Sequence, residues 1–279
     1  MLAIMVTVSG EYWQYVPLFV HSINHAYPEY MPVILGRGGI PADVSAQIHR
    51  YNLQCDVTDR ALDCYDGSAW AIKSLRWLIA PEKYKAVYIT DVDFLIIREP
   101  EGILESHLID CVKEGLCYSN TIHSEGLERG IRMMGMHFYV TEPYMMAMES
   151  VLGKYRHMLS ADIERLRLEW HNPALGVADN QYGLYRMIVE ARLGLPQEMY
   201  NPFRTYHGVH LGHSREPGRW EAFASKPSDF GTMPGPIGHY YHHFLELEST
   251  AKYRALYEVA PDFVTGQIDT FEKACELTL

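Results

Sequence analysis

The sequence predicts an α/β fold built on a mixed, mostly parallel sheet with helices on both faces. Short apolar runs rich in Val and Ile alternate with stretches of helical periodicity, the pattern of parallel strands joined by helices. Ser-Gly and Gly-rich turns end the first two of these runs, and an acidic pair ends a later one. The 279 residues contain no repeat, low-complexity tract or linker, which favours a single domain over residues 1–279.

The first half of the chain carries the regular alternation. Apolar runs predict strands at 2–8, 31–35, 53–57 and 86–90. Apolar residues at helical spacing predict helices at 15–24, 42–51 and 68–79. Ser68 is a suitable N-cap for the last of these helices, and Pro81 stops it. Because ligands bind beyond the carboxyl ends of strands in such sheets, we expect Ser9 and the acidic pair to lie at a binding crevice.

The second half is less regular. A strand is predicted at 135–140, followed by a helix that Thr141 caps and that runs to about 151. Helical periodicity returns at 179–191. From about residue 196 the chain is rich in His, Gly and Pro, and we expect an irregular C-terminal part.

Composition and charge narrow the classes of partner. The formal net charge is -11 and the Lys and Arg residues are scattered, which argues against nucleic acid because phosphate-backbone binding needs a positive face. The five cysteines have no CxxC spacing, which argues against a disulfide framework and a zinc knuckle. With no signal-peptide pattern and no apolar run long enough to span a bilayer, we expect a cytoplasmic protein, with peripheral membrane contact left open.

Asp91 and Asp93 flank one apolar residue at the end of the 86–90 strand. If Val92 points into the core, both carboxylates reach the crevice, where they suit a hard divalent cation, Mn²⁺ or Mg²⁺. The structural alternative is that they cap a following turn. Aspartyl-phosphate phosphatases also carry DxD after a strand, but their motif has Thr or Val where this chain has Leu95, so we reject that alternative.

The sequence resembles the GT-A glycosyltransferases, most closely glycosyltransferase family 8, over about residues 2–215. The segments that carry the resemblance are 6–12 with the following helix, the basic helix of Lys73 and Arg76, the aspartate pair, 179–181, and the loop at 207–212. The resemblance implies a GT-A fold, a nucleotide-sugar donor that is a UDP-sugar, a saccharide or other hydroxyl acceptor, and a retaining transfer of a hexosyl group.

The resemblance also implies a set of site residues. Arg215 or Lys73 can add a positive contact to the diphosphate. The expected nucleotide-sugar contacts are Val6, Thr7, Val8, Ser9, Tyr12, Lys73, Arg76, Asp91, Val92 and Arg215. Asp179 and Asn180 are expected near the anomeric carbon, and Gly135, His137 and Gln181 on the acceptor or sugar side. Helix-face, core-packing and N-cap roles remain structural alternatives for these residues, and Asp179 in particular suits an N-cap.

Six of the 14 histidines cluster late in the chain, at His207, His210, His213, His239, His242 and His243. The aspartate pair lacks a third protein ligand, and a neutral imidazole suits Mn²⁺. The resemblance points to His210, with His207 second. A zinc site of helical histidines is a poorer interpretation, because the Gly and Pro content of this segment argues against a helix.

Two other functional classes remain open. A nucleotidyltransferase of similar fold also holds a nucleotide and a metal, but usually carries a glycine-rich loop after the first strand, which Ser9-Gly10-Glu11 does not provide. A non-catalytic module that binds nucleotide sugars would fit better if one aspartate of the pair were missing, and both are present.

Overall fold

The computed structural model describes residues 1–99, 101–123, 131–196, 207–216, 218–220 and 235–278. Its main sheet contains β1 (Leu2–Val8), β2 (Met31–Gly36), β3 (Asp56–Thr58), β4 (Ala86–Ile89), β6 (Tyr118–Ser119) and β9 (His137–Val140). Their order across the sheet is β3-β2-β1-β4-β9-β6. The four strands from the first half are parallel, and β9 runs antiparallel to both of its neighbours. The predicted mixed, mostly parallel sheet is confirmed.

The strands lie close to their predicted positions, with two shifts. The strand expected at 53–57 is β3, which starts at Asp56, and the strand expected at 135–140 is β9, which starts at His137. Short two-stranded pairs flank the main sheet: β5 (Phe94–Ile96) with β12 (Gly208–His210), β7 (Ile122–His123) with β8 (Arg132–Met133), and β10 (His171–Asn172) with β11 (Val177–Ala178).

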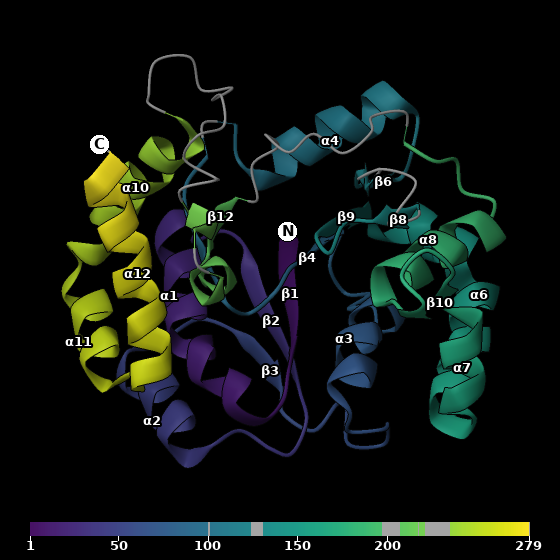
Figure 1. Cartoon of the computed structure of the whole chain (residues 1–279), viewed down its shortest axis with the longest axis horizontal. Coiled ribbons are helices and arrows are strands. Elements are labelled where there is room, and N and C mark those ends of the chain that lie inside the picture. Colours follow the sequence, from purple (N-terminus) through teal and green to yellow (C-terminus); the bar gives the residue numbers. More distant parts are fainter. Residues whose placement is uncertain (100, 124–130, 197–206, 217, 221–234, 279) are drawn as a thin grey trace.

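Helices cover both faces of the sheet (Figure 1). On one side lie α1 (Val16–Ala26), α2 (Ala42–Arg50), α10 (Gly235–Glu248), α11 (Ala251–Val259) and α12 (Asp262–Thr278). On the other lie α3 (Ala69–Leu78), α6 (Thr141–Ala161), α7 (Ile163–Glu169) and α8 (Asn180–Glu190). The helix α4 (Ile103–Glu114) and the 3-10 turns η1 (Gly10–Tyr15) and η2 (Leu211–Arg215) complete the described elements.

Side-chain alternation along β1 explains why the sheet is buried on both faces. Leu2, Ile4 and Val6 pack with α1 and the C-terminal helices in one hydrophobic cluster. Ala3 and Met5 pack with α3, α6 and α8 in the other. Because successive side chains in a strand point to opposite faces, a continuous apolar run is what a doubly covered strand requires.

The start of α3 agrees with its predicted cap, whereas the start of α6 does not. Ser68 precedes α3, and its side chain accepts a hydrogen bond from the Ala71 amide. Thr141 is the first helical residue of α6 rather than its cap, and the helix continues to Ala161 instead of ending near 151. Buried side chains along its second half, such as Leu152 and Tyr155, extend the apolar stripe and stabilise the longer helix.

The expectation of an irregular C-terminal part is wrong for residues 235–278, which form α10, α11 and α12. His242 and His243 lie on α10, so the argument from Gly and Pro content against a helix was also wrong. Gly235, Pro236 and Gly238 fall in the first turn of α10, where glycine and proline are tolerated. The remaining predicted loop segments, 197–206 and 221–234, and the side chain of His239 lie outside the described residues.

Among the described residues, no helix combines the length and the apolar character that crossing a bilayer requires.

Candidate functional site

The aspartate pair lies in the turn between β4 and β5, at the carboxyl end of the parallel strands. The Thr90 amide donates to the Met5 carbonyl of β1, which extends the β4 pairing to the edge of the turn. Val92 is buried in the core, as predicted, and Asp91 is partly exposed. Asp93 is only 4% exposed, so its carboxylate is held in a protein environment rather than in water.

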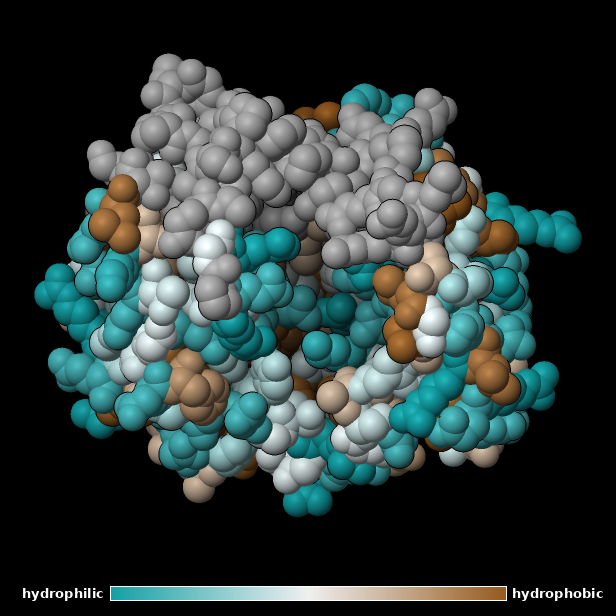
Figure 2. Space-filling model, viewed as in Figure 1, coloured by the Kyte–Doolittle hydropathy of each residue, from teal (hydrophilic) through white to brown (hydrophobic). Residues whose placement is uncertain are grey.

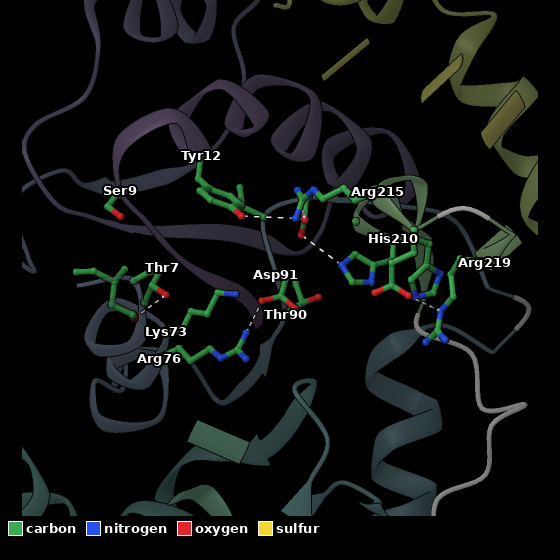
Figure 3. Close-up of a pocket in the computed structure, with 17 residues that line it drawn as sticks. Thr7, Ser9, Tyr12, Lys73, Arg76, Thr90, Asp91, His210, Arg215 and Arg219 are labelled. Carbon is green, nitrogen blue, oxygen red and sulfur yellow. Dashed lines mark hydrogen bonds and ion pairs between the residues drawn. The ribbon is translucent and has the colours of Figure 1, made fainter. Parts of the chain in front are cut away.

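A cavity of about 380 Å³ opens at this turn. Figure 2 shows that the face viewed in Figure 1 is hollowed near its centre. The residues expected from the sequence that line the cavity are Thr7, Ser9, Tyr12, Lys73, Arg76, Asp91, Val92, Asp93, His210 and Arg215. They come from β1 and the residue after it, η1, α3, the β4–β5 turn, β12 and η2, so the cavity joins segments that are far apart in the sequence (Figure 3).

Each aspartate is paired with an arginine. Arg76, buried on α3, donates from Nη1 to Asp91 Oδ1 at 2.5 Å. Arg215 on η2 donates from Nη2 to Asp93 Oδ2 at 2.7 Å. Figure 3 shows Lys73 and Arg76 reaching toward Asp91 from α3, while Arg215 and His210 approach from the opposite side. The cavity therefore contains positively charged side chains close to two carboxylates. The positive side chains suit an anionic ligand, and the carboxylates suit a cation.

His210 is placed by the pairing of β12 with β5. It lies opposite Phe94 in the ladder, and its ring stacks on the Phe94 ring at 4.4 Å between centroids. The next residue, Leu211, donates its amide to the Asp93 carbonyl at 2.8 Å. As a result, His210 Nε2 lies 3.5 Å from Asp93 Oδ1.

The charge state of Asp93 follows from these neighbours. Burial on its own would raise the pKa of the carboxyl, but the hydrogen bond and charge of His210, with the charge of Arg215, lower that pKa to about 2. Asp93 is therefore ionised at neutral pH. The pKa of the Arg215 guanidinium is shifted upward. Burial on its own would lower that pKa, but the contacts with Tyr15 and Asp93 raise it above its ordinary value.

The geometry fits a divalent cation. One possible ligand atom from each of Asp91, Asp93 and His210 lies within 4.8 Å of the other two, and within the described residues this is the one group of that kind. Gly212 lies directly against two of these side chains, because a Cβ there would lie 2.6 Å from His210 Nε2 and 3.1 Å from Asp93 Oδ2. Two carboxylates and an imidazole can supply oxygen and nitrogen ligands to a divalent metal ion.

Several lining residues were not anticipated from the sequence, namely Ala69, Ile72, Thr90, Gly212, His213, Glu216 and Arg219. Tyr15, which also packs in the hydrophobic core, accepts from Arg215 Nη2 at 3.2 Å through its hydroxyl. Tyr12 accepts from Arg215 Nη1 at 3.5 Å. The sequence offered one available signal, since Gly212 lies in the 207–212 loop that carries the resemblance.

Val6 and Val8 do not reach the cavity. They lie in the hydrophobic core, on the strand face opposite to Thr7 and Ser9. A run of consecutive strand residues cannot line one pocket, because only alternate side chains share a face. The expectation that these two side chains contact the nucleotide is therefore corrected.

His137 is also in the core rather than at the cavity. Its side chain is 1% exposed, and its ring nitrogens lie 3.1 Å from Asn120 Nδ2 and 3.2 Å from the Tyr144 hydroxyl. Burial lowers the pKa of this imidazole to about 3, so it is neutral. The acceptor-side position expected for His137 is corrected, because on β9 its side chain points between the sheet and α6.

Asp179 caps α8. Its Oδ1 accepts from the Gln181 amide at 3.0 Å, and its Oδ2 lies 3.7 Å from Arg132 Nη1. Asn180 is the first residue of the helix. The capping alternative is thus observed, and it leaves Asp179 Oδ2 without a hydrogen-bond partner among the described residues.

Gly135 and Gln181 lie beyond the described lining of the cavity, on the side where Arg76 lines it. A Cβ on Gly135 would lie 3.1 Å from Gln181 Nε2 and 3.4 Å from Arg76 Nη2. Gln181 Oε1 has no hydrogen-bond partner within the part of the chain that is described. Gly135 therefore lies between Gln181 on α8 and the guanidinium that pairs with Asp91.

No family model matches the sequence, and no curated protein matches it. Solved structures of glycosyltransferases are similar to the chain. The galactosyltransferase LgtC in complex with donor and acceptor sugar analogues is 16% identical, with 92% of this chain and 100% of that chain covered and a TM-score of 0.46. The apo glycosyltransferase GlyE of Streptococcus pneumoniae TIGR4 is 11% identical, with 92% and 62% covered and a TM-score of 0.48. Because a fold can host many activities, the function of this chain is argued from its own site.

Proposed function

We propose that this protein is a metal-dependent glycosyltransferase that moves a sugar from a UDP-sugar to a saccharide or other hydroxyl acceptor. One observation carries the proposal: Asp91, Asp93 and His210 converge in a cavity that Arg76 and Arg215 also line. Two carboxylates with an imidazole suit a divalent cation, and the surrounding bases suit the diphosphate of a nucleotide sugar. The proposal treats residues 1–279 as one domain.

The donor site follows from the placement of these groups. Asp91, Asp93 and His210 would hold Mn²⁺ or Mg²⁺, which when bound neutralises charge on a diphosphate. Arg215 and Lys73, which line the cavity from opposite sides, would contact the phosphate oxygens. Thr7, Ser9 and Tyr12 line the end of the cavity at β1 and η1, where the nucleoside would lie.

The sugar side would lie toward α8. Gly135 lies next to Arg76 and to Gln181 of α8, and Asp179 and Asn180 stand at the start of α8. In a retaining transfer the bond between the anomeric carbon and the phosphate oxygen breaks, and a bond to the acceptor oxygen forms on the same face. The departing phosphate accepts the proton of the acceptor hydroxyl, so no separate carboxylate base is required. Arg76 would orient the sugar and Arg215 would stabilise charge on the departing diphosphate.

The experiment that tests the proposal measures hydrolysis and transfer with a panel of nucleotide sugars, with and without Mn²⁺. We expect Mn²⁺-dependent release of uridine diphosphate from one UDP-sugar. Release of inorganic pyrophosphate from a nucleoside triphosphate and a sugar phosphate would instead identify a nucleotidyltransferase. Binding of a nucleotide sugar with no turnover on any acceptor would identify a non-catalytic module.

A further inference from the structure

A buried pair of histidines joins α4 to the strand that carries His210. His207 immediately precedes β12, and its Nε2 lies 3.1 Å from Nε2 of His107 on α4. The exposed fractions of the two side chains are 4% and 5%. Two imidazole nitrogens approach this closely when one carries hydrogen and the other accepts it, so the contact is an N–H···N hydrogen bond.

Packing fixes the His107 ring in this orientation. Its Nδ1 lies 2.9 Å from the Ser119 hydroxyl, which in turn donates to Asp110 at 3.1 Å. The ring also stacks on Phe138 at 4.9 Å between centroids, with an interplanar angle of 9°. His107 is therefore a rigid partner, held by β6, β9 and its own helix.

His207 adopts an unusual backbone conformation at this contact. Its φ is 58°, in the left-handed region that costs a non-glycine residue of order 1 kcal/mol or more. Its carbonyl accepts from the Ile97 amide at 3.1 Å, and its Nδ1 lies 3.7 Å from Glu99 Oε1. The hydrogen bond of the ring to His107 helps to offset the cost of this conformation.

The strand β12, which follows His207, needs a contact such as the His107–His207 hydrogen bond to hold it in place. Among the strands that the structure describes, the three-residue β12 pairs only with β5, and a two-stranded ribbon of this length is marginal in isolation. Gly208 sets how closely the strands approach, since a Cβ there would lie 2.4 Å from the Leu95 carbonyl oxygen. A slip of one residue would turn the His210 side chain to the other face of the ribbon, away from Asp93.

We propose that His107 is a positioning residue for the metal site. Through its hydrogen bond to His207 it holds the register of β12, and β12 holds the His210 imidazole beside Asp93. The inference rests on the proposed function, in which His210 is a metal ligand. The helix α4 contributes no residue to the described lining of the cavity, yet through His107 it acquires a role in metal affinity.

The test compares three variants of the full chain. His107→Phe keeps the ring that stacks on Phe138 and loses the hydrogen bond, whereas His107→Gln restores a side-chain donor. The matched control is His21→Phe, because His21 is also 5% exposed and its Nε2 lies 3.0 Å from the hydroxyl of Thr250, the N-cap of α11, rather than from a residue of β12. Binding of Mn²⁺ in the presence of uridine diphosphate is measured by calorimetry, together with the unfolding midpoint.

For His107→Phe we expect the Mn²⁺ dissociation constant to rise about tenfold, which corresponds to ~1.4 kcal/mol. His107→Gln and His21→Phe should stay within about threefold of wild type, the latter even where its unfolding midpoint falls. If His107→Phe fails to fold, His207→Asn decides, because Asn tolerates the left-handed conformation but does not reach His107. It should also show the tenfold rise. Wild-type affinity in either folded variant overturns the inference.

A second measurement separates this inference from the proposed function. If the wild-type protein binds no Mn²⁺, the proposed function fails. In that case, hydrogen exchange tests separately whether His107 holds β12 in place. The amides of residues 208–211 should exchange faster in His107→Phe than in wild type and in His21→Phe. Unchanged exchange at these amides would contradict the role of His107.

Discussion

Arg215 and Asp93 are 122 positions apart in the sequence, yet Nη2 and Oδ2 lie 2.7 Å apart in an ion pair. The pair joins η2 to the β4–β5 turn. η2 is held in turn by α12, where the Ser214 hydroxyl donates to the Gln267 carbonyl at 2.7 Å. The C-terminal helices therefore support one wall of the candidate active site, even though they contribute no side chain to its described lining.

Replacing Asp93 should remove sugar transfer. Asp93→Asn keeps the size of the side chain but removes the charge that pairs with Arg215 and that a cation would require. We expect Mn²⁺-dependent turnover to fall by at least about 100-fold, the scale of losing a major electrostatic contact in an active site. Turnover is measured by release of uridine diphosphate, with Asp43→Asn on the exposed side of α2 as the control. Near wild-type turnover in Asp93→Asn would contradict the metal assignment.

The depressed pKa of Asp93 predicts how stability depends on pH. The folded-state pKa is about 2, below the value of 3.8 for a free carboxyl, so the ionised group stabilises the fold. That stability is fully present above about pH 5 and is lost as the pH falls through about 2. Between these pH values, wild type should lose ~2 kcal/mol more than Asp93→Asn in free energy of unfolding. Urea unfolding at pH 5, 4, 3 and 2 measures it, and parallel curves for the two proteins would refute the ionised, paired state.

His210 and His213 form a matched pair for testing the third ligand. Both line the cavity, and their ring centroids are 4.7 Å apart, but only His210 belongs to the group with Asp91 and Asp93. His210→Ala should weaken Mn²⁺ binding about tenfold or more and lower turnover together, by analogy with other altered metal sites. His213→Ala should change the affinity much less. Mn²⁺ titration followed by electron paramagnetic resonance distinguishes the two, and equal losses would show that His210 has no special role.

Gly212 should tolerate no side chain if a cation is held here. In Gly212→Ala the added methyl would lie 2.6 Å from His210 Nε2, which forces the imidazole to move. We expect weaker Mn²⁺ binding with little change in secondary structure. Gly153→Ala is the control, because a Cβ on that helical glycine meets nothing within 4 Å. The control should gain up to ~1 kcal/mol of stability from the higher helix propensity of alanine. Wild-type Mn²⁺ affinity in Gly212→Ala would place the cation elsewhere.

Uridine diphosphate should raise the melting temperature only together with a divalent metal. A ligand that binds the native state stabilises it by about 2.7 kcal/mol at a hundredfold excess over its dissociation constant, which amounts to a shift of roughly 5 °C or more. Thermal unfolding is followed with Mn²⁺ and with excess chelator. An equal shift in chelator would mean that side chains such as Arg215 and Lys73 hold the diphosphate without metal. A larger shift with another nucleoside diphosphate would overturn the uridine preference.

Local patterns in the sequence were enough to predict the parallel sheet and the position of the aspartate pair. Strands such as β1 and β4 are continuous apolar runs because both of their faces are covered. The run of apolar residues in the sequence therefore predicts the burial. The cap of α3 at Ser68 and that of α8 at Asp179 are likewise short-range features, formed with amides two or three residues away. The helices at 235–278 were missed because their stability comes from packing on α1 and η2, which outweighs their glycine and proline content.

The composition of the site depended on contacts between distant segments. The pairing of β12 with β5 places His210 beside Asp93, whereas His207 precedes β12 and its ring lies against His107. Side-chain alternation along β1 removes Val6 and Val8 from the cavity, and the antiparallel β9 buries His137. These outcomes follow from strand register and from which helix covers which face, and both are decided by the packing of the whole chain.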